Sequence, residues 1–480
     1  MMIKRTFFSI LLALAATLPL MADTAQEAVD KFVSHSSLRY ASVGVTVVDL
    51  DSAKTIAGFR QDQANITAST MKTVVSSAAL GLMGPHFRFE TPVYLDGEVA
   101  DSSFRGNIVI RGLGDPTLGS VYLANQANIV DEIISALRAL GITRVEGTII
   151  GDDTYYGYPY YHNEWEMEDL AYDYGAAVHA LNFHDNLMKV GFTLDSRGRL
   201  SQSSVNPPVP GLKIISRCRP YRGRNNVTPY LDYSVPALVL TGNSSSKSYR
   251  GSYANPTPAP MLVDSVERAL RHNGINYEYY ATARDELNHA ERSLLVLHKS
   301  PELTEIITSL LDRSDNMFAH ALLRAIGARE WELRGDESMP DSLDYIGVDA
   351  VKRWLEQQGV STEPLFMRDG SGLARANKAS VNFFGDMLTM MAHRDFDGVR
   401  LCDLMPTASD RVGKTLENNP LNQRIVLKSG SMRHVQCFVG YYPAEAPRYA
   451  FAVLVNNFNC SRASIKDQIG TLLCNLFEGK

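Results

Sequence analysis

Apolar and polar positions repeat with two periods along the N-terminal part of this chain, and these periods predict its first elements. TAQEAVDKFVSH, at 24–35, repeats its apolar residues at helical spacing. SVGVTVVDL and TIAGFR, at 42–50 and 55–60, are strand-like and are separated by DSAK, which predicts a β-hairpin. ASTMKTVVSSAALGLM, at 68–83, is rich in Ala, Leu and Met and predicts a helix.

The middle of the chain has a different pattern. GNIVIRGLGDPTL, at 106–118, predicts a strand that runs into a turn, and ANIVDEIISALRALG, at 127–141, predicts a helix that ends at Gly141. ITRVEGTIIGDD, at 142–153, predicts one further strand. Between about 190 and 260, short strand-like pieces alternate with polar turns, which indicates a small β-rich module.

Strong helical and strand patterns return near the C-terminus. Helices are predicted within 301–328, where a loop meets a helix near Ser314, and at 347–359, 381–394 and 464–477. IVLKSG, HVQCFVGYY and RYAFAVLVNNF predict three consecutive strands. We expect these strands to share one sheet with the N-terminal hairpin. The region between the hairpin and these strands would then be an insertion.

The length of 480 residues is too great for one ordinary domain. We therefore divide the chain into a split domain and an insertion. We expect the split domain at 23–90 and 286–480. The insertion is expected at 91–285, with an α/β part at about 91–187 and a β-rich part at about 188–260.

The first 22 residues resemble a secretory signal peptide. Lys4 and Arg5 precede an apolar core, and small residues follow near Ala22, where cleavage is expected. A retained membrane anchor is the alternative, but the apolar stretch is short for a span. We therefore expect export to the periplasm or elsewhere in the cell envelope, with no stable membrane span after cleavage.

Charge and cysteine content exclude some partners. The net charge of -6 comes without a basic cluster, which argues against nucleic acid. The odd number of cysteines means that at least one is free or pairs outside the chain, and Cys437 and Cys474 are expected in the core. No Cys/His spacing suggests zinc. His179 and His184 do not share a helix face, so neither a metal nor a cofactor is expected.

Ser69 and Lys72 form the first candidate for chemistry. On a helix these residues share a face one turn apart. Burial disfavours the charged form of a lysine, and a neutral amine can take a proton from a neighbouring hydroxyl. Because S-x-x-K also occurs in the polar loop at 244–247, where the lysine is simply solvated, the motif alone leaves a surface lysine as the alternative.

Two further short motifs follow in the sequence. Ser314, Asp315 and Asn316 form S-D-N where a loop meets a helix, an arrangement that helix capping alone would explain. Lys428, Ser429 and Gly430 end an apolar run, where a glycine lets a ligand approach a strand closely. S-x-x-K, S-x-N and K-S/T-G, in this order and these settings, are the three motifs of serine β-lactamases and penicillin-binding proteins.

The spacing of these motifs narrows the resemblance. Ser69 and Ser314 are 314 − 69 = 245 residues apart, which requires inserted domains. The chain resembles the D-alanyl-D-alanine carboxypeptidase/endopeptidase family, the class C type low-molecular-mass penicillin-binding proteins, over nearly its whole mature length. The matching stretches are GLGDPTL at 112–118, GTIIGDD at 147–153, YGAAVHALNFHDN at 174–186, SDNMFAHALLR at 314–324 and DGSGLARAN at 369–377.

Three positions depart from the family pattern. Ser429 stands where threonine is commoner, His179 where a serine is expected, and Met167 where a second tryptophan often follows Trp165. The hydroxyl of Ser429 keeps the expected carboxylate contact, and the other two departures have no interpretation here. DELNHAE, at 285–291, looks like a class A β-lactamase stretch but precedes S-D-N, so it is interpreted as an ordinary segment.

The resemblance implies an α/β (α+β) fold: an antiparallel sheet flanked by helices, with one or two smaller, mostly β domains inserted. It implies a serine D,D-peptidase that cleaves the terminal D-Ala-D-Ala bond or D,D cross-links of peptidoglycan stem peptides, with β-lactams as covalent inhibitors. Two alternatives stay open: a β-lactamase or esterase of the same fold, and a muropeptide-binding protein without turnover. The sequence leaves open which of the two D,D-peptidase activities dominates.

The site residues are assigned as hypotheses. Ser69 is the nucleophile, Lys72 its base, and the backbone N–H groups of Ser69 and Ser431 the oxyanion hole. The resemblance implies the remaining roles. Ser314 and Lys428 carry the proton to the leaving amine, Asn316 positions the substrate amide or Lys72, and Ser429 with Lys428 holds the terminal carboxylate. Met432 and, with Glu168 as its neighbour, Asp169 shape the pocket for the diamino acid side chain.

Overall fold

The computed structural model describes residues 24–124, 126–221, 226–244, 247–279, 292–335 and 342–478. The predicted signal peptide at 1–22 and the DELNHAE stretch lie outside the described residues. Contacts within the chain define two compact units. Unit 1 comprises the described parts of Met1–Pro85, Leu310–Ser314 and Val348–Lys480, and unit 2 those of His86–Ser309 and Asp315–Gly347.

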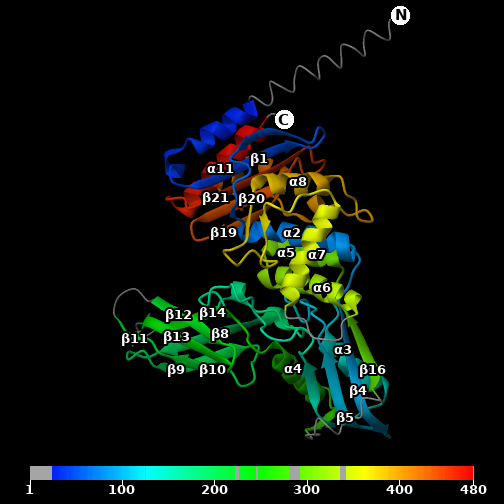
Figure 1. Cartoon of the computed structure of the whole chain (residues 1–480). Coiled ribbons are helices and arrows are strands. Elements are labelled where there is room, and N and C mark those ends of the chain that lie inside the picture. Colours follow the sequence, from blue (N-terminus) through cyan, green and yellow to red (C-terminus); the bar gives the residue numbers. More distant parts are fainter. Residues whose placement is uncertain are drawn as a thin grey trace, which may run out of the picture. The chain divides into compact units, whose positions relative to one another are not determined.

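Unit 1 is built on a five-stranded antiparallel sheet (Figure 1). The predicted hairpin is confirmed, and its first strand pairs along its whole length with the last strand of the chain. The strand order is β19 (Val426–Met432), β20 (Val435–Tyr442), β21 (Tyr449–Asn456), β1 (Ser42–Asp49) and β2 (Lys54–Phe59). The expectation that the hairpin and the three C-terminal strands share one sheet is therefore confirmed.

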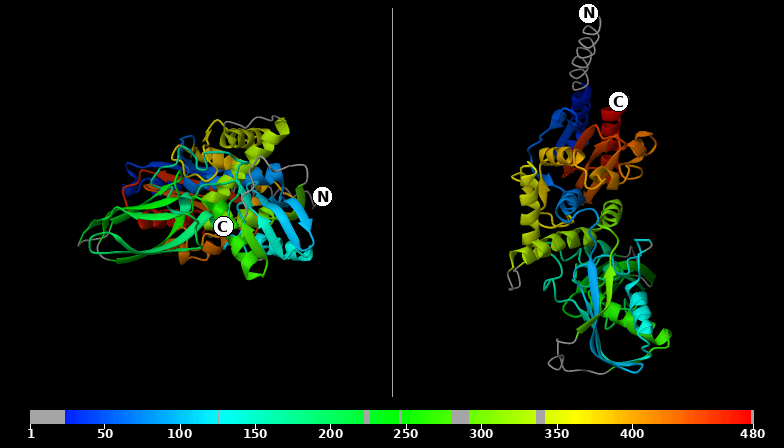
Figure 2. Two further views of the ribbon diagram at one scale, coloured as in Figure 1. Left: turned by 90° about the horizontal axis from the view of Figure 1, so that it is seen from below. Right: turned by 90° about the vertical axis from the view of Figure 1, so that its right-hand side faces the viewer.

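Helices cover both faces of this sheet. The helix at 24–33 and α11 (Arg462–Phe477) bury their apolar side chains together against one face, and Figures 1 and 2 show them side by side, in dark blue and red. On the other face α8 (Val381–Ala392) packs against β1 and β21, and the Tyr441 hydroxyl donates to the Leu388 carbonyl at 2.9 Å. Burial on both faces explains why β20 and β21 consist of nearly continuous apolar residues.

The remaining elements of unit 1 are a small sheet, the helix α2 (Met71–Met83) and short turns, and two further helices cross the unit boundary. A small sheet joins β3 (Asn65–Ile66), β18 (Lys378–Ala379) and β17 (Leu365–Phe366). Its other helical elements are η1 (Ser36–Leu38), η2 (Ala68–Thr70), α2 (Met71–Met83), η7 (Leu401–Leu404), α9 (Lys414–Glu417) and α10 (Leu421–Arg424). The unit boundary passes through α5 (Leu303–Arg313) and α7 (Leu343–Gln357).

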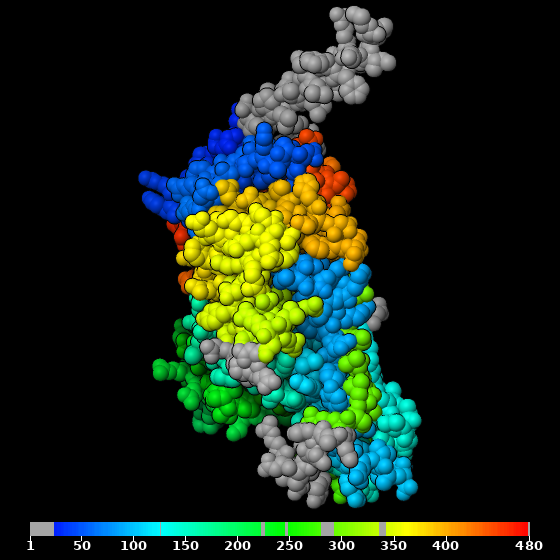
Figure 3. Space-filling model, turned by 45° about the vertical axis from the view of Figure 1, so that its right-hand side comes forward, coloured from blue at the N-terminus to red at the C-terminus, as the bar shows by residue number. Residues whose placement is uncertain are grey.

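Unit 2 contains a six-stranded mixed sheet backed by two helices. Figure 3 shows one edge of this sheet, where β16 in light green lies beside β4 in blue. The helices α3 (Ile129–Ala139) and α4 (Pro258–His272) share its apolar core. The strands are β15 (Asn276–Tyr279), β6 (Arg144–Gly147), β5 (Ser103–Arg111), β4 (Glu90–Ala100) and β16 (Arg292–Lys299), with β7 (Ile149–Asp152) also paired to β5.

The strand predicted at 142–153 is present with an interruption. β6 and β7 both run parallel to β5 in the same register, β6 beside Ser103–Arg105 and β7 beside Ile108–Arg111, and the ladder is broken at Gly147 and Thr148 between them. Gly147 has φ +155, and a Cβ on it would lie 1.7 Å from the Gly106 carbonyl oxygen. Only a glycine permits so close an approach, and this contact ends β6.

Two small sheets form within residues 187–254, where a β-rich module is predicted at about 188–260. One orders β14 (Lys247–Ala254), β8 (Leu187–Leu194) and β9 (Leu200–Asn206). The other joins β10 (Lys213–Ser216), β13 (Ala237–Ser244), β11 (Arg219–Pro220) and β12 (Asn226–Asp232). Unit 2 also contains the single turns η3 (Asp173–Gly175) and η4 (His184–Asn186), and the long helix α6 (Asn316–Arg334).

The compact units divide the chain differently from the predicted domains. The described parts of 286–309 and 315–347 pack in unit 2, although the sequence pattern places them in the split domain. β16 joins the unit 2 sheet through β4, and Arg324 on α6 donates to the Val178 carbonyl at 2.8 Å. The domain limits 23–90 and 286–480, with 91–285 inserted, stay a prediction.

Candidate active site

Ser69 and Lys72 lie in contact at the start of α2. Ser69 belongs to the short turn η2, and Lys72 is the second residue of the helix that follows. The Lys72 Nζ donates to the Ser69 Oγ at 2.9 Å, while Lys72 is fully buried and Ser69 is partly exposed. Ala68, directly before the serine, has φ +47, a strained conformation for a residue other than glycine. A buried amine therefore holds an accessible hydroxyl at hydrogen-bonding distance.

A second contact of Lys72 was not predicted from the sequence. Its Nζ also donates to the Ser371 carbonyl at 2.6 Å, across 299 residues of chain. The buried Asp369 carboxylate holds this turn by accepting hydrogen bonds from the backbone N–H groups of Ser371, Gly372 and Ala374 at 2.6–2.8 Å. The D-G-S-G sequence could have indicated a tight turn, but nothing in it indicates that the turn faces Lys72.

Gly430 brings the third motif against the first. A Cβ on Gly430 would lie 2.8 Å from the Thr67 carbonyl oxygen, 2.9 Å from the Ser69 nitrogen and 3.0 Å from the Thr70 nitrogen. All three are backbone atoms, so β19 can pass this close to η2 only without a side chain. The following residue, Ser431, pairs with Gln436 in the sheet and is exposed. The backbone of β19 is thus fixed beside the Ser69 N–H group.

Lys428 is the second buried amine of unit 1's site. It is 1% exposed and donates from Nζ to the Ser429 carbonyl at 2.8 Å. Burial lowers the pKa of Lys428 well below its ordinary value, and the charges of Lys72 and Arg411 lower this pKa further, while Asp312 opposes them. Arg411 and Asp312 themselves form an ion pair at 2.5 Å. Lys428 therefore gives up its proton more readily than an ordinary lysine.

The S-D-N motif is divided by the boundary between the units. Ser314 follows α5, has φ +60 and is partly exposed in unit 1. Asp315 is the N-cap of α6, and its side chain accepts a hydrogen bond from the Phe318 N–H group at 3.0 Å. The capping role is thus filled by Asp315, which leaves the Ser314 hydroxyl outside the helix.

The other predicted residues have different surroundings. Asn316 begins α6 in unit 2, and its amide donates to the Tyr174 carbonyl at 2.7 Å. Asp169, also in unit 2, is partly exposed and accepts a hydrogen bond from the Tyr174 hydroxyl at 3.0 Å. Burial raises the pKa of Tyr174, and the Asp169 charge raises it further. Met432 is the partly buried last residue of β19 in unit 1.

The histidines and cysteines have structural surroundings. His179 is buried, its Nδ1 donates to the Asp153 carboxylate at 2.7 Å, and its ring stacks on the Tyr160 ring. Within the described ranges, no group of three or more His, Cys, Asp or Glu side chains could hold a metal ion. Cys437 and Cys474 are buried in the core as predicted, and all five cysteines are free thiols.

Among residues 24–478, leaving out the gaps given above, no helix is both long and apolar enough to cross a bilayer.

Comparisons with known proteins extend over nearly the whole chain. The model of the D-Ala-D-Ala carboxypeptidase 3 (S13) family matches residues 25–476. The D-alanyl-D-alanine carboxypeptidase DacB of Haemophilus influenzae is 23% identical over 438 residues, covering 87% of this chain and 86% of the relative. The D-alanyl-D-alanine carboxypeptidase of Actinomadura sp. strain R39 is 24% identical over 468 residues, covering 93% and 84%.

A solved structure supports the fold. The crystal structure of penicillin binding protein 4 (dacB) from Haemophilus influenzae has a TM-score of 0.75 with this chain at 22% identity. The match covers 93% of this chain and 98% of that one. The predicted α/β fold, an antiparallel sheet flanked by helices with an insertion, is confirmed by this likeness.

Proposed function

The chain belongs to the D-Ala-D-Ala carboxypeptidase 3 (S13) family, and we propose that Ser69 performs the chemistry of this serine hydrolase through an acyl-enzyme. Family membership and the curated relatives make the chain a serine-type, penicillin-binding D,D-peptidase. The observation that supports Ser69 is its 2.9 Å hydrogen bond to the buried Lys72 amine. A buried amine is a base that can activate a hydroxyl without a histidine.

Acylation begins with proton transfer from Ser69 to Lys72. The Ser69 Oγ attacks the carbonyl carbon of the penultimate D-alanine, and the carbonyl oxygen becomes an oxyanion. The Ser69 N–H and the Ser431 N–H stabilise that charge, and the close passage of Gly430 along η2 supports this assignment. Ser371, whose carbonyl accepts a hydrogen bond from Lys72, keeps the amine aimed at the nucleophile.

Release of the leaving group requires a proton at its nitrogen. The proton that Lys72 took from Ser69 passes to it through Lys428 and Ser314, and the lowered pKa of Lys428 supports this role. When the terminal D-alanine leaves, its carboxylate departs from Ser429 and Lys428. Water then hydrolyses the acyl-enzyme and regenerates Ser69. The roles of Asn316 and Asp169, in unit 2, rest on the family resemblance alone.

We propose peptidoglycan stem peptides as the substrates and the cell envelope as the location. The same steps cleave a terminal D-Ala-D-Ala bond or a D,D cross-link, because both present a D-alanyl carbonyl to Ser69. The segment at 1–22, in which basic residues precede an apolar stretch, supports export to the periplasm. β-Lactams are expected to acylate the same serine.

The first test is the intact mass of the protein after brief exposure to benzylpenicillin. We expect a stable adduct of one penicillin, because a penicillin-binding protein deacylates slowly. No adduct with rapid loss of penicillin would identify a β-lactamase instead. No adduct and no loss would leave the muropeptide-binding alternative.

Asp169→Asn tests the substrate pocket. If the Asp169 carboxylate contacts the free ammonium of the diamino acid side chain, this variant should lower kcat/KM for peptides that carry the ammonium by about 10-fold or more. Peptides without the ammonium should be cleaved at the wild-type rate. Measured kcat/KM values that fall equally for both peptides would exclude the assignment, and Glu168→Gln is the control for the adjacent carboxylate.

A further inference from the structure

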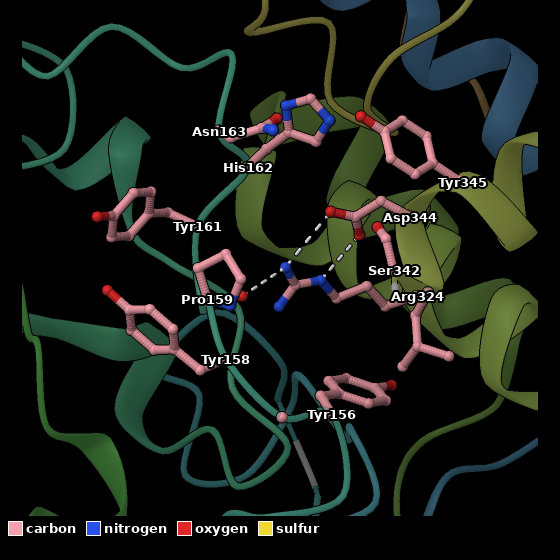
Figure 4. A pocket seen from close by; sticks show the side chains of 12 residues that line it. Tyr156, Tyr158, Pro159, Tyr161, His162, Asn163, Arg324, Ser342, Asp344 and Tyr345 are labelled. Carbon is pink, nitrogen blue, oxygen red and sulfur yellow. Dashed lines mark hydrogen bonds and ion pairs between the residues drawn. The ribbon is translucent and has the colours of Figure 1, made fainter. Parts of the chain in front are cut away.

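Unit 2 contains a cavity that none of the residues assigned above lines. It has a volume of about 360 Å³ and lies between the loop at 156–163, α6 and the start of α7 (Figure 4). A volume of this size lies in the range of small-ligand sites. Among the described residues, its lining consists of Tyr156, Gly157, Tyr158, Pro159, Tyr161, His162, Asn163, Arg324, Ser342, Leu343, Asp344 and Tyr345.

The buried Arg324 at the centre of this cavity has no donor left for a ligand. Its Nε donates to the Asp344 carboxylate at 2.9 Å, and its Nη1 donates to the Tyr160 and Val178 carbonyls at 3.1 and 2.8 Å. Its Nη2 donates to the Pro159 carbonyl at 3.1 Å and to Asp344 at 3.4 Å. Because a guanidinium has five N–H groups, these contacts use all of them.

The Asp344 carboxylate beside Arg324 is likewise occupied by its own partners. Burial raises the pKa of Asp344, but the charges of His320 and Arg324 lower it by more, so Asp344 stays ionised and paired with Arg324. Arg324 and Asp344 therefore cancel each other's charge. Within the described part of the lining, Arg324 and Asp344 are the only arginine and the only carboxylate, and they pair with each other. An anionic ligand would find no unused guanidinium N–H group in the described part of this lining.

Tyrosine rings and neutral polar groups form the rest of the wall. Figure 4 shows Tyr158 and Tyr161 on one side of the ion pair and Tyr345 on the other. Tyr158 is 71% exposed and Tyr345 is 49% exposed, so both offer apolar ring surface to solvent. The amide of Asn163 and the hydroxyl of Ser342 add uncharged donors and acceptors. Aromatic rings with polar ends suit a ligand that has both apolar faces and hydroxyl groups.

We propose that this cavity binds an uncharged, N-acetylated sugar ring of a glycan strand. Pyranose rings present C–H faces that cover aromatic rings and hydroxyl and amide groups that pair with neutral polar side chains. A phosphate or carboxylate ligand is disfavoured by the saturated Arg324, and a purely apolar ligand by the hydroxyl and amide groups. The sugar's identity rests on the proposed function, because stem peptides are attached to such a glycan.

The test uses the full chain and a tetramer of N-acetylglucosamine, with affinity measured by ligand-observed NMR titration. We expect wild type to bind, and Tyr158→Ala and Tyr345→Ala each to weaken binding about two- to tenfold through loss of ring contact. Tyr279→Ala removes a ring of 66% exposure from β15, away from the lining, and should bind as wild type does.

Several outcomes would overturn the proposal. They are no binding by wild type, equal binding by all four proteins, and tighter binding of N-acetylglucosamine 6-phosphate, which would mean recognition of an anion. The benzylpenicillin adduct, measured on the same samples, separates this proposal from the function. Acylation without sugar binding removes only the sugar site. Sugar binding without acylation removes the D,D-peptidase assignment and leaves the sugar site.

Discussion

Ser69→Ala is expected to abolish both the benzylpenicillin adduct and the release of D-alanine. The substitution removes the only atom that the proposed mechanism uses to form the acyl-enzyme, while Lys72 and the oxyanion donors stay in place. Loss of a serine nucleophile costs on the order of 10⁶-fold in kcat in hydrolases that act through such a unit. Intact mass and a D-alanine release assay measure the two losses independently.

Ser76→Ala is the matched control for this substitution. Ser76 lies on the same helix α2, is fully buried, and its Oγ has no hydrogen-bond partner among the described residues. Removing that hydroxyl should leave acylation at the wild-type rate. If Ser69→Ala still forms a one-penicillin adduct while Ser76→Ala does not, the assignment of the nucleophile is wrong.

Gly430→Ala is expected to slow acylation by about 10²-fold or more, the loss that follows removal of one oxyanion donor. The new Cβ would lie within 3.0 Å of three backbone atoms of residues 67–70, none of which can rotate away. β19 would have to move from η2, and the Ser431 N–H would move with it. The second-order rate constant for acylation by benzylpenicillin measures the effect.

Gly470→Ala provides the control for the general effect of adding a methyl group in unit 1. Gly470 lies on α11, and a Cβ there would meet its nearest atom at 3.4 Å, an ordinary contact. Helix propensity favours alanine over glycine, so this variant should fold at least as well as wild type. Acylation of Gly430→Ala at the Gly470→Ala rate would contradict the proposed approach of β19 to Ser69.

The local sequence pattern was sufficient to predict those features that depend on the residues of a single segment. The apolar runs of β20 and β21 predicted strands, and the structure then buries both faces of these strands. The spacing of Ser69 and Lys72 predicted their contact, because residues three apart on a helix share a face. Turn residues and helical periodicity likewise placed α3, α8 and α11 within a few residues of their observed bounds.

Contacts between distant segments were decided only by the tertiary structure. The second partner of Lys72 is the Ser371 carbonyl, a backbone atom 299 residues away, and every residue type has such an atom. The membership of β16 in the unit 2 sheet depends on its pairing with β4, about 200 residues earlier, and no periodicity within β16 encodes its partner.

The cavity in unit 2 shows the same limit. Arg324 reads as an ordinary helix residue in the sequence, and its burial follows from three segments that supply its acceptors. The spacing of residues along the sequence was thus enough to predict the helices and strands and the contact between Ser69 and Lys72. The turn that holds Lys72, the close passage of Gly430 along η2 and the Arg324–Asp344 pair in the cavity arose from packing between segments. Such packing depends on the whole folded chain.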